Sequence, residues 1–118
     1  MSSRFITGNL AADPEAVQAG NVQIVKLRVI ENTGEYRNGK FVAHADPTTH
    51  FVEAKFELGA NVLASLHRGD AVGVFGREHT ASWGPERNKT YGRVIVADWV
   101  GPGLDNATAQ ITRNQRQQ

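Results

Sequence analysis

The chain contains no cysteine, a single methionine and no long hydrophobic run. Without cysteine, neither a disulfide framework nor a thiolate metal site is possible. The lack of a membrane-length apolar segment and of a signal-peptide core predicts a cytoplasmic protein with no membrane association. With 13 Lys and Arg against 12 Asp and Glu, the net charge is +1. This balance argues against a strongly basic protein. Binding to an anionic partner therefore has to be inferred from where the charges lie along the sequence.

The 118 residues, of which 40% are hydrophobic and 21% charged, are typical of one soluble globular domain. Apolar and polar residues alternate in several short stretches, which is the pattern of half-buried strands. We predict five strands and one helix: strands at Arg4–Asn9, Val22–Asn32, His50–Phe56, Ala71–Glu78 and Tyr91–Val100, and a helix at Leu58–His67.

Two long polar connections separate these elements. The first, 32–49, contains the turn signal Asn38-Gly39 and is interpreted as a hairpin arm or mobile loop. The second, 79–90, contains glycine, proline and Trp83 and is interpreted as a loop. The order of three strands, a helix and two strands is that of a five-stranded Greek-key barrel, the OB-fold, in an all-β domain.

The third strand shows which residues face inward. Its residues alternate between two faces. We expect the core face to carry His50, Val52, Ala54 and Phe56, and the outer face to carry Phe51, Glu53 and Lys55. Phe51 then projects from the outer face, either as a stacking platform or as a subunit contact. In the second strand, Lys26 and Arg28 share one face, which gives that face local positive charge.

Four motifs occur in an order that resembles one family. They are GNLAADPE at 8–15, NVLASLHRGDAV at 61–72, VFGR at 74–77 and ADWVGPGL at 97–104. Together they resemble the bacterial and phage single-stranded DNA-binding proteins. The resemblance implies an OB-fold that coats single-stranded DNA without sequence preference during replication, recombination or repair. It also implies a homotetramer located at the nucleoid or at replication sites.

Base stacking and phosphate contacts are what such a function requires. The resemblance places a base-stacking tryptophan at Trp83, although packing of this ring on its own loop is the alternative. Tyr36 is a second stacking candidate, equally consistent with hairpin packing. The candidate phosphate contacts lie on the two connections and on strand faces: Lys26, Arg28, Arg37, Lys40, Lys55, Arg77, Arg87, Lys89 and Arg93. Of these, Arg28, Lys55, Arg77 and Arg87 are the strongest candidates.

The chain departs from the family pattern at two places. Thr49 and Lys55 stand where the family usually carries aromatic rings, which predicts weaker or more salt-sensitive DNA binding, with Lys55 contacting a phosphate instead. A competing hypothesis is therefore an OB-fold protein-interaction module or replisome scaffold with weak DNA affinity. A third hypothesis is an RNA chaperone.

The second departure is the C-terminal segment. We expect residues 1–104 to form the OB-fold domain and residues 105–118 a short polar tail that is disordered in isolation. The tail lacks the acidic tip through which family members recruit repair proteins, so this recruitment is not expected.

The remaining polar residues predict no catalysis and no cofactor. No hydroxyl has a histidine and acid partner at a recognisable spacing, and no phosphate-cradling glycine loop is present. His44, Asp46 and His50 form a poor metal-ligand set in a turn-rich segment, so we predict no metal site. His50 is interpreted as a core or interface histidine, near the subunit contact that the family resemblance implies.

Overall fold

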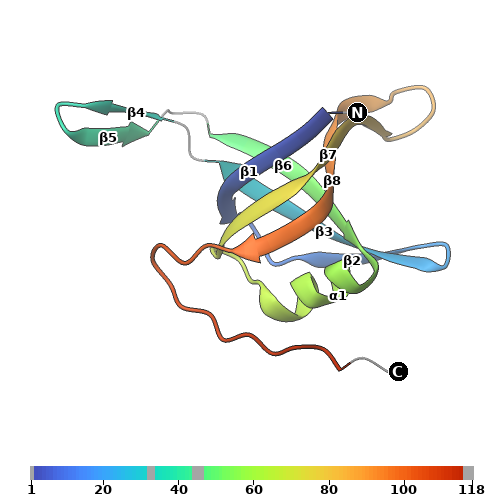
Figure 1. Ribbon diagram of the computed structural model, residues 1–118. Helices are drawn as coiled ribbons and strands as arrows, with labels where there is room; N and C mark the ends of the chain where they lie inside the picture. Colours follow the sequence, from blue (N-terminus) through green and yellow to red (C-terminus); the bar gives the residue numbers. More distant parts are fainter. Residues whose placement is uncertain (1, 32–33, 44–46, 116–118) are drawn as a thin grey trace.

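The computed structural model describes residues 2–31, 34–43 and 47–115, and within them the chain forms eight strands and one helix (Figure 1). The strands are β1 (Ser2–Leu10), β2 (Glu15–Ala19), β3 (Val22–Glu31), β4 (Gly34–Arg37), β5 (Lys40–Ala43), β6 (Thr48–Lys55), β7 (Ala71–Trp83) and β8 (Thr90–Pro102). The helix α1 (Phe56–Ser65) lies between β6 and β7. Its ten residues are too few to cross a membrane, and the described part of the chain has no other helix.

Five of these strands close into a barrel in the order β1-β7-β8-β6-β3. β1 pairs along Ser2–Asn9 with β7, and at its other end Asn9 and Leu10 pair with β3, which closes the ring. β6 and β8 form the parallel pair of the barrel. With a helix between the third and fourth barrel strands, this arrangement confirms the predicted OB-fold.

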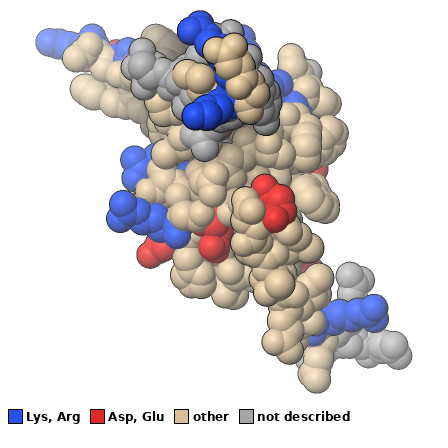
Figure 2. Space-filling model, turned by 90° about the vertical axis from the view of Figure 1, so that its left-hand side faces the viewer, with Lys and Arg blue, Asp and Glu red and all other residues tan. Residues whose placement is uncertain are grey.

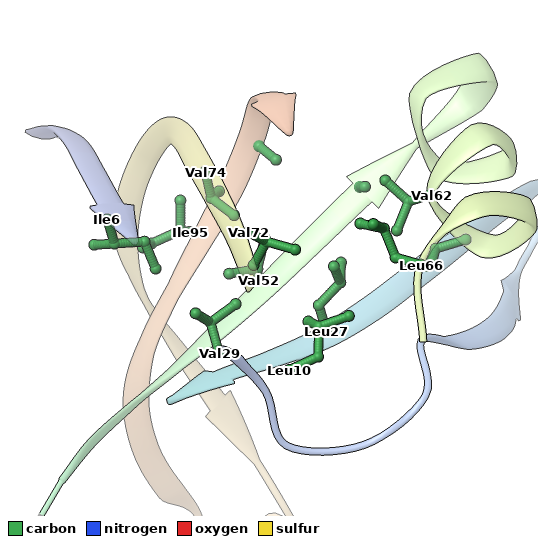
Figure 3. Packing of buried hydrophobic residues seen from close by; sticks show 13 residues of the cluster. Ile6, Leu10, Leu27, Val29, Val52, Val62, Leu66, Val72, Val74 and Ile95 are labelled. Carbon is green, nitrogen blue, oxygen red and sulfur yellow. The ribbon is translucent and has the colours of Figure 1, made fainter. Parts of the chain in front are cut away.

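The core fills the barrel with inward-facing residues of every barrel strand (Figure 3). Val25, Leu27 and Val29 of β3 are buried, on the face opposite the one that Lys26 and Arg28 share. Val62 and Leu66, in and just after α1, cover the end of the barrel near Leu27 and Leu10. Burying a side chain of this size stabilises a fold by about 1.5–3 kcal/mol, so the cluster is the main source of stability.

The prediction that Phe56 of the third predicted strand faces the core is wrong. Val52 and Ala54 are buried and His50 is nearly so, but Phe56 is 73% exposed. The strand ends at Lys55, and Phe56 begins α1 with a φ of 58°, a left-handed conformation that is unusual for a bulky residue. The turn from strand to helix therefore interrupts the period of two before it reaches Phe56.

Half of the connection predicted over 79–90 is strand. β7 continues to Trp83 and pairs there with Thr90 of β8, so the turn is confined to 84–89. This two-stranded ribbon extends beyond the barrel (Figure 1), where both faces meet solvent and the apolar alternation that identifies a strand is lost. The sequence also missed β2, whose short, mostly exposed strand pairs with β3.

The first connection contains the hairpin that Asn38-Gly39 predicts. β4 and β5 pair through Arg37 and Lys40, and the two turn residues have φ values of 51° and 78°. Positive φ at both positions is the geometry of a type I′ turn, which matches the twist of a hairpin. Figure 1 shows this hairpin and the β7–β8 ribbon projecting from opposite sides of the barrel.

Residues 103–115 form neither helix nor strand and run past α1 (Figure 1). Asn114 Nδ2 donates hydrogen bonds to Glu57 Oε2 and Asn61 Oδ1, each at 2.9 Å. These bonds hold the segment against the exposed side of the helix. The assignment of residues 105–118 to a separate tail stays a prediction.

Candidate functional site

A groove of about 990 Å³ crosses the outer faces of β3 and β6 and continues along the β7–β8 ribbon. Basic and aromatic side chains lie in its lining together: Lys26, Arg28, Phe51, Trp83, Tyr91 and Arg93. Five of these six residues are candidates predicted from the sequence, contributed by four different strands. The barrel topology is what brings them to one surface.

Phe51 and Trp83 form an aromatic pair in this groove. Their ring centroids lie 6.3 Å apart at an interplanar angle of 56°, while 46% of Phe51 and 39% of Trp83 remain exposed. Val94 of β8, which is paired with Phe51 in register, is buried beside the pair. Both rings are thus partly open to solvent, as a stacking platform requires.

Trp83 is positioned by a glycine. The ring lies against Gly92 so closely that a Cβ atom at that position would be 2.6 Å from Cζ3 of the indole. Since Trp83 ends β7 and is held on the ribbon, the prediction that it lies in a loop is wrong. Its contact is with the opposing strand rather than with its own loop.

The charges next to the platform are unevenly balanced. Arg28 lies opposite Phe51 in the register of β3 and β6, whereas Lys26 lies between Glu53 on β6 and Glu15 on β2. Neighbouring carboxylates lower the positive potential around Lys26. Arg28 is therefore the better placed of the two cations to contact an anion beside the rings.

A buried carboxylate organises two arginines at the mouth of the barrel. Glu78 Oε1 accepts hydrogen bonds from Nη1 of Arg93 at 2.9 Å and from Nη1 of Arg4 at 3.3 Å. The Glu78 side chain is 5% exposed. Tyr91 is two residues before Arg93 on β8 and is exposed on the same side of the strand. All four residues line the groove.

Arg4, Glu78 and Tyr91 were missed by the sequence reasoning. A signal for Glu78 was present, because it continues the inward-facing series of Val72, Val74 and Gly76. A carboxylate at an inward position needs cationic partners. Arg4, which precedes the inward-facing Ile6, could have been found in the same way.

Other predicted contacts lie outside this groove. Arg77 is on the outer face of β7, with Nη2 3.5 Å from Asp98 Oδ1. Lys55 ends β6 and occupies the N-cap of α1. Arg87 and Lys89 lie in the turn of the β7–β8 ribbon, where Lys89 Nζ is 3.6 Å from Glu86 Oε2. Arg87 and Lys89 lie outside the groove because the long ribbon carries its turn beyond the barrel. Lys55 lies outside it because the helix begins directly after this residue.

The β4–β5 hairpin carries two more candidates. Arg37 and Lys40 flank its turn, and Figure 2, viewed from this side, shows lysine and arginine in several separate groups rather than in one patch. Tyr36 belongs to β4, but its side chain lies outside the described part of the structure. Its predicted role stays a prediction.

His50 faces inward at the mouth of the barrel, with a side chain that is 10% exposed. Its Nε2 atom lies 2.6 Å from Glu31 Oε2. Its interface role stays a prediction. His44 and Asp46, the other members of the rejected metal set, lie outside the described residues, within which no group of three or more potential metal ligands is found.

A second set of rings lies on the outer face of β1, β7 and β8. Phe5 lies opposite Phe75 in register, and Phe75 lies opposite Trp99. All three are exposed. Trp99 packs over Gly101, where a Cβ atom would be 2.5 Å from Cη2 of the indole. These three residues form what we call the apolar sheet face.

Solved structures of other proteins share this fold, among them two that are similar to most of this chain. The small single-stranded DNA-binding protein from Streptomyces coelicolor matches with a TM-score of 0.75 and 23% identity, covering 87% of this chain and 94% of that one. The second single-stranded DNA-binding protein from Mycobacterium smegmatis, SSBb, matches with a TM-score of 0.69 and 24% identity, covering 95% and 98%. No family model and no curated protein matches the chain. The structural likeness confirms the OB-fold over most of the chain.

Proposed function

We propose that the protein binds single-stranded DNA without sequence preference and protects it during replication, recombination or repair. The observation that carries this proposal is the exposed Phe51–Trp83 pair in a groove that also contains Lys26, Arg28 and Arg93. Stacking on such rings contributes about 1–3 kcal/mol per base and tolerates any base, since every base has a flat face. The cations contact the phosphates between stacked bases. The activity is binding, with no chemical step.

The fold shared with two single-stranded DNA-binding proteins supports the same proposal. So does the composition of the site, because its exposed rings can stack only on bases that are unpaired, as they are in a single strand. Thr49 is exposed on the outer face of β6, two residues before Phe51, and adds no ring. We therefore expect a short stacking platform and a strong dependence of affinity on salt concentration.

We propose that the protein assembles as a homotetramer in which the apolar sheet face contacts a second copy. Three large exposed rings on neighbouring strands form the kind of patch that marks a protein interface. The flanking Arg77 is paired with Asp98, so this face has little charge to attract a nucleic acid. This assembly leaves the groove on another side of the barrel open to DNA.

The first experiment is a titration with oligo(dT) that follows tryptophan emission at two salt concentrations. The chain has two tryptophans, so Trp99→Phe isolates the signal of Trp83 and Trp83→Phe isolates that of Trp99. We expect strong quenching in Trp99→Phe and little in Trp83→Phe. Replacing the ring altogether, in Trp83→Ala, should weaken binding about tenfold or more, the equivalent of one stacked base.

The same titration separates the competing functions. If the parent protein shows neither quenching nor binding at low salt, DNA coating is wrong, and an OB-fold interaction module that docks through the apolar sheet face is favoured. If oligo(U) binds more tightly than oligo(dT) of equal length, the RNA chaperone is favoured instead.

A further inference from the structure

The cluster of Arg4, Glu78 and Arg93 lies at inward-facing positions where the barrel opens. Arg4 precedes Ile6 on β1, Glu78 follows Val74 and Gly76 on β7, and Arg93 precedes Ile95 on β8. The three side chains therefore continue the core pattern with charged groups. A carboxylate that is 5% exposed is strongly disfavoured unless cations compensate it, and here two arginines do so.

The two arginines keep capacity for another anion. Relative exposure of their side chains is 40% for Arg4 and 70% for Arg93. A guanidinium carries five N–H donors, and the bonds to Glu78 Oε1 use one nitrogen of each. Two positive charges against one negative leave the cluster cationic. The nearby Glu31 carboxylate is bonded to His50 and does not contact the arginines.

The cluster and the aromatic platform line the same groove. Arg93 is followed by Val94, the register partner of Phe51, and preceded by Gly92, against which Trp83 packs. Arg93 and the platform thus share one short segment of β8 but project from its two sides. Because all three residues line one groove, a strand whose bases stack on Phe51 and Trp83 passes near Arg93.

We propose that Arg4 and Arg93 form a phosphate-binding site at the mouth of the barrel, and that Glu78 is the positioning residue that orients both guanidiniums. The inference rests on the proposed function and adds to it a defined contact for one backbone phosphate. Arginine loses much side-chain freedom when it binds a phosphate, and an ion pair formed in advance reduces that loss. Planar guanidiniums held in this way present paired donors to phosphate oxygens.

The direction in which Glu78→Gln changes the affinity for DNA distinguishes a Glu78 that positions the arginines from one that only neutralises their charge. If Glu78 only opposes the positive field, Glu78→Gln removes a negative charge near the DNA and strengthens binding. If Glu78 orients the arginines, the same substitution weakens binding although the protein becomes more positive. We expect Glu78→Gln to bind oligo(dT) at least threefold more weakly than the parent.

The experiment measures oligo(dT) affinity by fluorescence anisotropy over a series of salt concentrations. Arg93→Met should reduce the slope of log K against log salt by about 0.7, the value for one phosphate contact on a single strand. Arg93→Lys should keep the slope but bind more weakly, because an ammonium lacks the paired donors. Arg113→Met, which removes an exposed charge on the C-terminal segment, is the matched control and should leave the slope unchanged.

Three outcomes would overturn the proposal: stronger or unchanged binding by Glu78→Gln, an unchanged slope in Arg93→Met, or an equal loss of slope in Arg113→Met. Thermal denaturation checks that Glu78→Gln folds, and if it does not, the exposed Arg93 variants decide alone. Failure of the parent to bind oligo(dT) would overturn the proposed function together with this site. A parent that binds while the variants behave like it would overturn the site alone.

Discussion

The barrel carries two exposed tryptophans on two outer surfaces, and the comparison between them shows what makes an aromatic surface selective. Trp83 packs over Gly92 and Trp99 packs over Gly101, so a side chain at either glycine would collide with the indole. Each also lies close to a phenylalanine: Phe51 in the groove and Phe75 on the apolar sheet face. By ring content alone, the two surfaces would be expected to bind the same ligands.

Their surroundings differ. Four cations line the groove with its rings, Arg4, Lys26, Arg28 and Arg93, and four carboxylates line it as well. Arg77, beside the apolar sheet face, is paired with Asp98. The groove is also concave, while the three rings of the sheet face project from adjacent paired strands. Aromatic rings beside cations in a concave groove are suited to bind a polyanion whose bases can stack on them. Rings on an open sheet, where the neighbouring arginine is already paired, suit another protein surface.

The largest effects are expected from a carboxylate placed on each surface. Phe75→Asp puts a charge into the proposed contact between copies and should weaken self-association by roughly a hundredfold. Phe51→Asp removes a ring and adds a charge that repels phosphate, so it should weaken DNA binding by a similar factor of roughly a hundred. Light scattering measures the first effect and oligo(dT) titration the second.

Each of these variants is the control for the other. Phe75→Asp should bind a short oligo(dT) as the parent does, because one groove on one subunit suffices. Phe51→Asp should keep the mass of the parent assembly. If both variants lose both properties, the two surfaces are one functional unit and the division of roles proposed for them is wrong.

An intermediate effect is expected from adding one methyl group beneath each indole. Gly92→Ala has no room for its Cβ and must displace the Trp83 ring from the groove, which should weaken DNA binding about fivefold to tenfold. Gly101→Ala displaces Trp99 in the same way and should leave DNA binding unchanged. Tryptophan emission without DNA verifies that each ring has moved. Equal loss of binding in both variants would argue for a general loss of barrel stability.

The smallest effect is expected from single cations. Arg28→Met should reduce the salt slope of oligo(dT) binding by about 0.7 and weaken binding a few-fold, because Arg28 lies opposite Phe51. Arg77→Met removes the same charge on the other surface, where Asp98 already neutralises it, and should leave the slope as it is. An effect of Arg77→Met equal to that of Arg28→Met would extend the DNA path across both surfaces.

Much of the barrel could be predicted from local patterns. Alternation identified the inward faces of β3 and β6, and the pair Asn38-Gly39 identified the β4–β5 turn, since only a few residues adopt positive φ easily. Prediction was poorest where strands leave the barrel. The distal parts of β7 and β8 have solvent on both sides, so their sequence resembles a loop, and Trp83 was placed in a loop for that reason.

The site was predicted only in part, and the reason is related. Phe51, Trp83, Lys26, Arg28 and Arg93 were recognised as residue types suited to DNA, but Arg77 was grouped with them although it lies on another surface. Arg77 and Trp83 even share one face of β7, six residues apart. A strand twists and the barrel curves, so a face that is continuous in sequence turns from one surface of the molecule to another.

The sequence by itself determined the inward faces of β3 and β6, the turn of the β4–β5 hairpin and the order of the barrel elements, because these depend on local backbone preference and on a period of two. Only the tertiary structure decided that Phe51 meets Trp83, that Arg4 and Arg93 meet on Glu78, and that Trp99 faces elsewhere. These contacts join residues on different strands, and their geometry depends on register and barrel closure, which no local pattern encodes.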